Sequence, residues 1–155
     1  MIRLILCIVI VFSSTIGGFY FSSKLSKRKD ILLNFELELK NTLTKIRYNQ
    51  SNLSQLFENN FMGYSFDDSK KFSLQWNEML NNYKEILTDE DIRVLADFSK
   101  SVGTLDLTGE ISNINLYIDL IRERIIDAQK DIVKKSKLYQ TLGTSLGLCI
   151  AILLI

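Results

Sequence analysis

The chain has 155 residues and a formal net charge of +1, with 46% hydrophobic and 24% charged residues. These averages hide an uneven distribution, because all 18 acidic residues lie between Asp30 and Asp131 and both ends are apolar. The near-zero charge gives no support for nucleic-acid binding. With no histidine and only two cysteines, the sequence predicts no metal site, no cofactor and no catalytic residue.

Residues 1–23 are predicted to form a membrane span. The uncharged run from Leu4 to Phe21 would make a helix of about 27 Å, close to the thickness of a bilayer's hydrocarbon core. A cleaved signal peptide is the alternative, and Arg3 near the start fits it. The bulky Phe19–Tyr20–Phe21 sequence, followed at once by basic residues, favours an uncleaved anchor.

Residues 24–137 are predicted to form a cytoplasmic helical bundle. Apolar residues recur every three or four positions in 30–48, and again in 72–83, where Trp76 is expected to anchor the core. The polar segment 49–60 has a short apolar face of its own, and 62–68 is typical of a loop. No segment alternates with period two, so the fold class is predicted to be all-α. The two longer stripes are Leu32, Phe35, Leu39, Leu43 and Ile46, then Phe72, Trp76, Met79, Leu80 and Tyr83.

Two further helices follow in the sequence. Thr88 is a good N-cap, and the three acids after it, Asp89, Glu90 and Asp91, suit the positive end of a helix dipole. The same acids could hold a divalent cation, but they lack the glycine and the spaced ligands of a calcium loop, so the cap is favoured. Gly103 is expected to end this helix, and Asp106 or Thr108 to cap one long helix that continues to the C-terminus.

Residues 138–155 are predicted to form a second membrane span. Seven basic residues border the two spans on the domain side, whereas only Arg3 lies on the other side. The excess of basic residues on cytoplasmic loops predicts a cytoplasmic central domain with both termini outside. The seven are Lys24, Lys27, Arg28, Lys29, Lys134, Lys135 and Lys137.

Small residues form one face of each predicted span. Ser14 and Gly18 are four residues apart in the first, and Gly143 and Gly147 are four apart in the second. In lipid, such faces let helix backbones approach closely. The interpretation is that the two faces pack together within one chain. Packing between copies of the chain, and a chance occurrence of glycine, are the alternatives.

The sequence resembles the stage III sporulation protein AB family of endospore-forming bacteria along its whole length. The closest similarity is the run from Lys137 to Leu148, KLYQTLGTSLGL, which is similar to a Lys-Leu-Tyr-x-x-Leu-Gly-x-x-x-Gly-Leu run before an Ile/Leu tail. A second similarity covers Leu87–Asp91 and Phe98–Asp106, with Glu110 where the family segment has glutamine. A third is Ile46–Tyr48.

The resemblance implies an all-helical domain similar to the F-protein domains of type II secretion inner-membrane platforms. It also implies partners: a secretion-type ATPase and other stage III sporulation channel proteins, at the outer forespore membrane facing the mother cell. The expected function is therefore a non-enzymatic, membrane-anchored component of a secretion-like complex. A membrane-anchored sensor or regulator is the alternative.

Five acidic residues are candidates for contact with a basic ATPase surface, because residues 30–133 have a net charge of −7. A merely solvated face is the alternative interpretation. The five are Glu36, Glu38, Asp89, Glu90 and Asp91.

Overall fold

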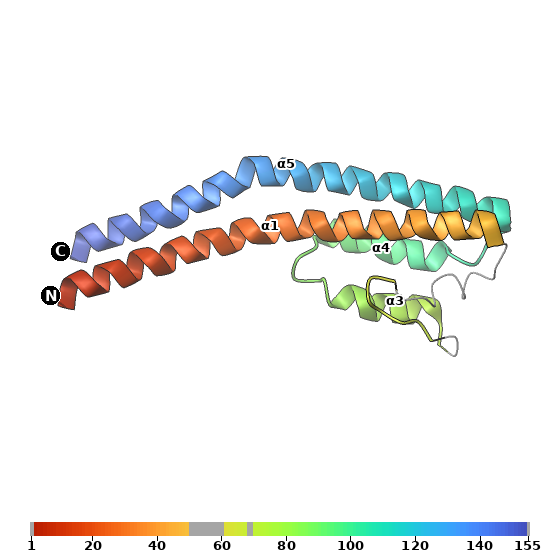
Figure 1. Cartoon of the computed structure of the whole chain (residues 1–155), viewed down its shortest axis with the longest axis horizontal. Coiled ribbons are helices and arrows are strands. Elements are labelled where there is room, and N and C mark those ends of the chain that lie inside the picture. Colours follow the sequence, from red (N-terminus) through yellow and green to blue (C-terminus); the bar gives the residue numbers. More distant parts are fainter. Residues whose placement is uncertain (1, 50–60, 68–69, 155) are drawn as a thin grey trace. The chain divides into compact units, whose positions relative to one another are not determined.

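The computed structural model describes residues 2–49, 61–67 and 70–154, and these residues form four helices and no strand. The helices are α1 (Ile2–Asn49), α3 (Phe72–Asn81), α4 (Asp89–Ser101) and α5 (Leu107–Leu154) (Figure 1). The all-α prediction is confirmed, as is the prediction of one long C-terminal helix. Of the segment 49–60, only Asn49 lies within the described residues, so Leu53, Leu56 and Phe57 of its predicted apolar face lie outside them; Phe61, the last residue of that face, is described and is buried.

The chain divides into two compact units. Residues 1–29 and 127–155 form unit 1, and residues 30–126 form unit 2. Helices α1 and α5 contribute residues to both units, whereas α3 and α4 belong to unit 2.

Unit 2 has an apolar core built mainly from helical side chains. The predicted stripes are buried except at Phe72 and Tyr83, which are half-buried, and Trp76 has no exposed surface. The Trp76 ring contacts Phe35 of α1, Phe61, and Phe98 of α4, and its indole Nε1–H donates to the Leu95 carbonyl at 2.8 Å. A buried tryptophan with its one donor satisfied fixes α3 against α4. The buried apolar residues of unit 2 are Leu32, Phe35, Leu39, Leu43, Ile46, Phe61, Trp76, Met79, Leu80, Leu87, Leu95, Phe98, Ile114, Ile118 and Ile121.

Helix α4 begins with the predicted cap. The Thr88 hydroxyl accepts from the Asp91 N–H at 3.3 Å, and the Asp91 carboxylate accepts from the Thr88 N–H at 3.0 Å. This reciprocal pair satisfies two donors that a helix N-terminus leaves open. The helix role of the acidic run is thereby confirmed.

The connection between α4 and α5 turns at Gly103, whose φ of +83° is a conformation that favours glycine. Glu110 holds this connection: its Oε1 accepts from the N–H groups of Gly103 and Leu105 at 2.7 and 3.1 Å. Its Oε2 is buried and has no hydrogen-bond partner in the described part of the chain. Asp106 then caps α5 by accepting from the Gly109 N–H at 3.1 Å, which decides between the two caps expected there.

Candidate membrane hairpin and candidate partner surface

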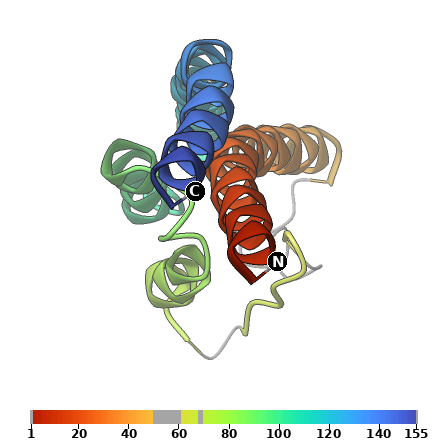
Figure 2. The same ribbon diagram turned by 90° about the vertical axis from the view of Figure 1, so that its left-hand side faces the viewer.

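In unit 1, α1 and α5 lie side by side with both chain ends at the same end of the pair (Figures 1 and 2). The glycines define how closely they approach. A Cβ at Gly18 would lie 2.7 Å from the Tyr139 carbonyl oxygen, and a Cβ at Gly143 would lie 2.9 Å from the Ser14 carbonyl oxygen. At Gly147 it would lie 3.1 Å from the side chain of Ser14. The structure therefore brings Ser14, Gly18, Gly143 and Gly147 together within one chain.

Hydroxyl groups bridge the two helices along the same face. The Ser14 hydroxyl donates to the Gly143 carbonyl, the hydroxyls of Ser22 and Ser136 bond to each other, and Gln140 Nε2 donates to Ser22 at 3.2 Å. In an apolar surrounding, such bonds between helices are favourable because the alternative is an unsatisfied polar group. Sequence reasoning missed Ser22, although it continues the four-residue spacing of Ser14 and Gly18.

A cluster of charged residues lies next to the Ser22–Ser136 contact, on the side away from the chain ends. Arg28 is buried and bonds to Asp131 at 2.8 Å, and Lys135 binds the same carboxylate at 2.7 Å. The hydrogen bond from Lys135 is the main reason that the pKa of Asp131 is lowered, with Arg28 adding to it. The same contact raises the pKa of Lys135. Arg28 and Lys135, two of the seven basic residues that border the predicted spans, are therefore paired with an acid within the chain.

The distribution of polarity in unit 1 is the reverse of that in unit 2. Every buried residue among those described in unit 1 is small or polar: Gly18, Ser22, Arg28, Ala128, Gly147 and Ala151. Its large apolar side chains face outward, and Phe12, Ile16 and Leu153 are 67%, 66% and 86% exposed. Others are Ile8, Val9, Phe19, Tyr20, Phe21, Leu138, Leu142, Leu146, Leu148, Ile150 and Ile152.

One helix among the described residues is long and apolar enough to cross a membrane, and it is the Ile8–Ile46 part of α1. This segment lies near the N-terminus, as the first predicted span does, and suggests membrane association. By the same criteria of length and apolar composition, the described part of α5 does not qualify as a second span.

Two of the five candidate acids, Glu36 and Asp91, are buried. Glu36 is only 8% exposed and binds Lys40 and Arg122 at 2.7 and 3.1 Å. Burial would raise the pKa of Glu36, but the contacts with Lys40 and Arg122 outweigh it and the pKa is lowered. Asp91 is fully buried, where it caps α4 and binds Arg124 Nε at 3.1 Å. Both acids stabilise the bundle from inside.

The other three candidates remain accessible. Asp89 and Glu90 are exposed at the start of α4, although Glu90 also binds Arg124 at 2.7 Å, and Glu38 is half-buried on α1. Helical periodicity could not separate Glu38 from Glu36, because the basic partner of Glu36 on α5 lies 86 residues away in the sequence.

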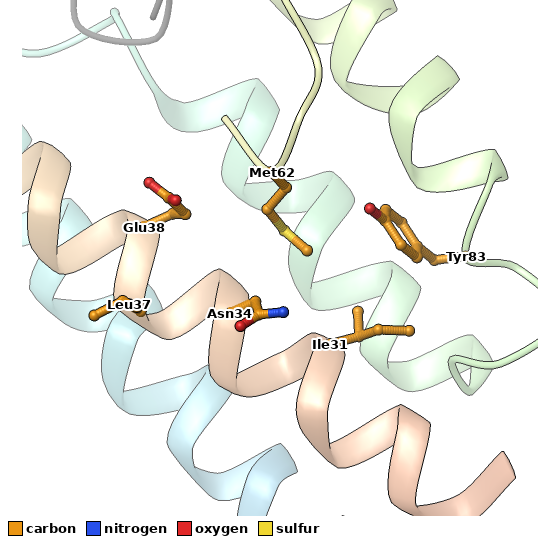
Figure 3. Close-up of a pocket in the computed structure, with 6 residues that line it drawn as sticks. All are labelled: Ile31, Asn34, Leu37, Glu38, Met62 and Tyr83. Atoms are coloured by element: carbon orange, nitrogen blue, oxygen red, sulfur yellow. The ribbon is translucent and has the colours of Figure 1, made fainter. Parts of the chain in front are cut away.

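Glu38 lines a groove of about 320 Å³ in unit 2 (Figure 3). Ile31 and Asn34 of α1 form one side, and Met62 and Tyr83 lie across from them. Met62 has a φ of +52°, an uncommon conformation for a residue with a side chain. The groove can accept an apolar side chain beside a carboxylate, and sequence reasoning missed it because its walls come from separate segments.

Neither the curated proteins nor the solved structures match the chain. The model of the stage III sporulation protein AB family matches residues 3–155. This match covers nearly the whole chain, including both units, the glycines of unit 1 and the acids of unit 2. The chain belongs to the stage III sporulation protein AB family.

Proposed function

We propose that the chain is a non-enzymatic sporulation protein, anchored by two membrane spans, that presents unit 2 in the cytoplasm to a secretion-type ATPase. Membership of the stage III sporulation family supports the role in sporulation. The observation that carries the membrane part is the reversed polarity of unit 1, with glycine and serine buried and phenylalanine, leucine and isoleucine exposed.

Reversed polarity is what a helix pair in lipid requires. In water, the hydrophobic effect buries large apolar side chains, as it does in unit 2. In a bilayer, lipid tails solvate those side chains as well as protein does, so close backbone contact and hydrogen bonds between helices bring the pair together. A pair like that of unit 1 is suited to lipid along both helices, which supports a second span in α5 as well as the first in α1.

Charge supports the orientation and the partner class. Unit 1 carries nine basic and two acidic residues, whereas unit 2 carries ten basic and sixteen acidic residues. Basic residues beside the spans favour the cytoplasmic side, so unit 2 is cytoplasmic. Its net charge of −6, with Glu38, Asp89 and Glu90 accessible, suits a basic partner surface, and the groove beside Glu38 suits an apolar side chain.

Fractionation of a spore-forming host tests the anchor and its orientation. Alkaline carbonate strips peripheral proteins, so the chain is expected to stay with the membrane pellet. Protease added to sealed protoplasts is expected to leave residues 30–133 uncut. Release by carbonate would refute the hairpin, and cutting within a sealed membrane would refute the orientation.

Charge reversal tests docking. The variant Glu38→Lys/Asp89→Lys/Glu90→Lys is expected to lose co-purification with the ATPase, and the wild-type contact is expected to weaken with salt, since screening acts over ~8 Å at physiological ionic strength. The matched control is Asp97→Lys/Asp119→Lys/Glu123→Lys, which makes the same change in charge at exposed positions. Equal loss in both variants would show that net charge, and not this surface, mediates binding.

Deletion distinguishes the proposal from a sensor or regulator outside any secretion machine. A deletion strain is expected to fail to complete sporulation, and a fluorescent fusion is expected at the membrane around the forespore on the mother-cell side. Normal sporulation of the deletion strain would favour the alternative.

A further inference from the structure

Five lysines of unit 1 have no carboxylate partner among the described residues. They differ from Arg28, Lys130 and Lys135, which bind Asp131 or Asp127 at 2.7–3.2 Å. The five are Lys24, Lys27, Lys29, Lys134 and Lys137, and three of them, Lys27, Lys134 and Lys137, are exposed.

The contacts between α1 and α5 place three of these lysines, Lys24, Lys27 and Lys134, at one level of the helix pair. Ser22 is opposite Ser136, and Arg28 is opposite Asp131. Residues 24 and 27 of α1 therefore lie at the same level as residues 131–136 of α5, which include Lys134. Since Ser22, Ser136 and Arg28 occupy the contact face, the free lysines lie on other faces of the two helices.

An aromatic layer lies directly beside this level. The rings of Phe21 and Tyr139 are 5.9 Å apart across the pair, and Tyr20 contacts Phe21 edge-on at 5.9 Å. Tyr20 and Phe21 are more than half exposed. Aromatic side chains gather where a bilayer's hydrocarbon meets its headgroups. At ~1.5 Å per residue, Lys137 lies ~3 Å and Lys27 ~9 Å beyond this layer, which is headgroup depth.

We propose that the free lysines of unit 1 form a binding surface for the phosphate groups of anionic phospholipids. The proposal rests on the proposed hairpin, and it adds a preference for lipid charge that an apolar anchor alone does not have. A lysine ammonium can reach from its helix to a headgroup along its flexible stem. Because the local acids already bind Arg28, Lys130 and Lys135, the charge of the five lysines is not cancelled within the described part of unit 1.

Spin-labelled lipids test the preference directly. The full chain is placed in nanodiscs of phosphatidylcholine with a minor fraction of phosphatidylglycerol, and the motionally restricted fraction of each labelled lipid is measured. Each lysine near an anionic surface favours binding by up to about fivefold. The chain is expected to hold phosphatidylglycerol severalfold more strongly, and added salt is expected to reduce this preference.

Matched variants assign the effect to the surface. Lys27→Gln/Lys134→Gln is expected to lower the preference for phosphatidylglycerol severalfold, whereas Lys71→Gln/Lys84→Gln, at exposed lysines of unit 2, leaves it unchanged. Equal retention of the two lipids by the wild-type chain would overturn the proposal, as would equal effects of the two variants. An unchanged lipid preference in Lys27→Gln/Lys134→Gln would overturn it as well.

Insertion is measured separately, in discs of phosphatidylcholine alone and by resistance to carbonate. A chain that inserts without a lipid preference refutes the headgroup surface and leaves the hairpin standing. A chain that does not insert refutes the hairpin itself.

Discussion

Two neighbouring glycines of α1 provide a matched test of helix packing in unit 1. A Cβ at Gly17 would meet nothing within 4 Å, whereas a Cβ at Gly18 would lie 2.7 Å from the Tyr139 carbonyl oxygen and 3.3 Å from the Gly143 Cα. Both of those neighbours are backbone atoms, so they cannot rotate away. Gly17→Ala is therefore expected to be tolerated, and Gly18→Ala to push the helices apart.

The size of the effect follows from the difference between the two variants. Either alanine favours the helix by up to ~1 kcal/mol over glycine, and this gain cancels in the comparison. Forcing a methyl group into a close-packed contact costs ~1–3 kcal/mol. This cost increases the equilibrium opening of the pair by roughly 5- to 150-fold.

Alkylation of a buried thiol measures that opening. Ser22→Cys, in a chain lacking Cys7 and Cys149, places one thiol at a position that is only 7% exposed. A maleimide then reacts at a rate set by how often the pair opens. Gly18→Ala is expected to accelerate labelling by the factor above, and Gly17→Ala to leave it unchanged or slower. Equal rates in the two variants, with both chains inserted, would refute the close contact.

Oxidation of the Ser22→Cys/Ser136→Cys chain serves as the control for packing within one chain. The hydroxyls of the two serines are in contact, so a disulfide within the chain is expected. Disulfides found only between chains would replace the hairpin with an oligomer contact.

Three further predictions concern unit 2, and each is measured by denaturant unfolding of the full chain in detergent. Asp91→Ala removes a cap and breaks a buried ion pair, so it is expected to lower the free energy of unfolding by about 3 kcal/mol. The exposed control Asp97→Ala is expected to lower it by less than ~0.5 kcal/mol, and equal losses would contradict the internal role of Asp91. Glu110→Gln keeps an acceptor for the two turn N–H groups and is expected to cost less than ~1 kcal/mol, whereas Glu110→Ala leaves both unpaired and is expected to cost ~2–4 kcal/mol. The folded-state pKa of Glu36 is lowered, so its contribution to stability is present above its unfolded pKa and is lost as the pH falls through the folded pKa. Arg122→Met is expected to reduce that loss. An unchanged dependence of the free energy of unfolding on acid pH would contradict this prediction.

Much of the fold of unit 2 could be predicted from the sequence because its signals are local. The three- and four-residue spacing of Leu32, Phe35 and Leu39 marks the buried face of α1, and all three have no exposed surface. The start of α4 depends on Thr88 and Asp91, which are three residues apart, so the signal is visible in the local sequence. Spacing and caps are therefore sufficient to place helices.

The candidate partner surface could be predicted only in part, because charge pairing depends on distant residues. Spacing leaves Glu36 and Asp91 on the polar side of their helices, and only the fold shows that Arg122 and Arg124 of α5 bind them inside unit 2. The groove beside Glu38 likewise needs Met62 and Tyr83 from separate segments. In unit 1, small residues at a spacing of four identify the contact face, but they do not reveal the pair of Arg28 with Asp131, 103 residues apart.

The single tryptophan gives the protein a built-in fluorescent reporter of one unit. Trp76 lies in the core of unit 2, and unit 1 contains no tryptophan. Its emission is expected to shift to the red when water reaches the indole, so the spectrum follows the unfolding of unit 2 without a label. Tryptophan emission and thiol alkylation at position 22 therefore follow the two units as separate signals in the same sample, and a difference between their midpoints measures how independently the units unfold.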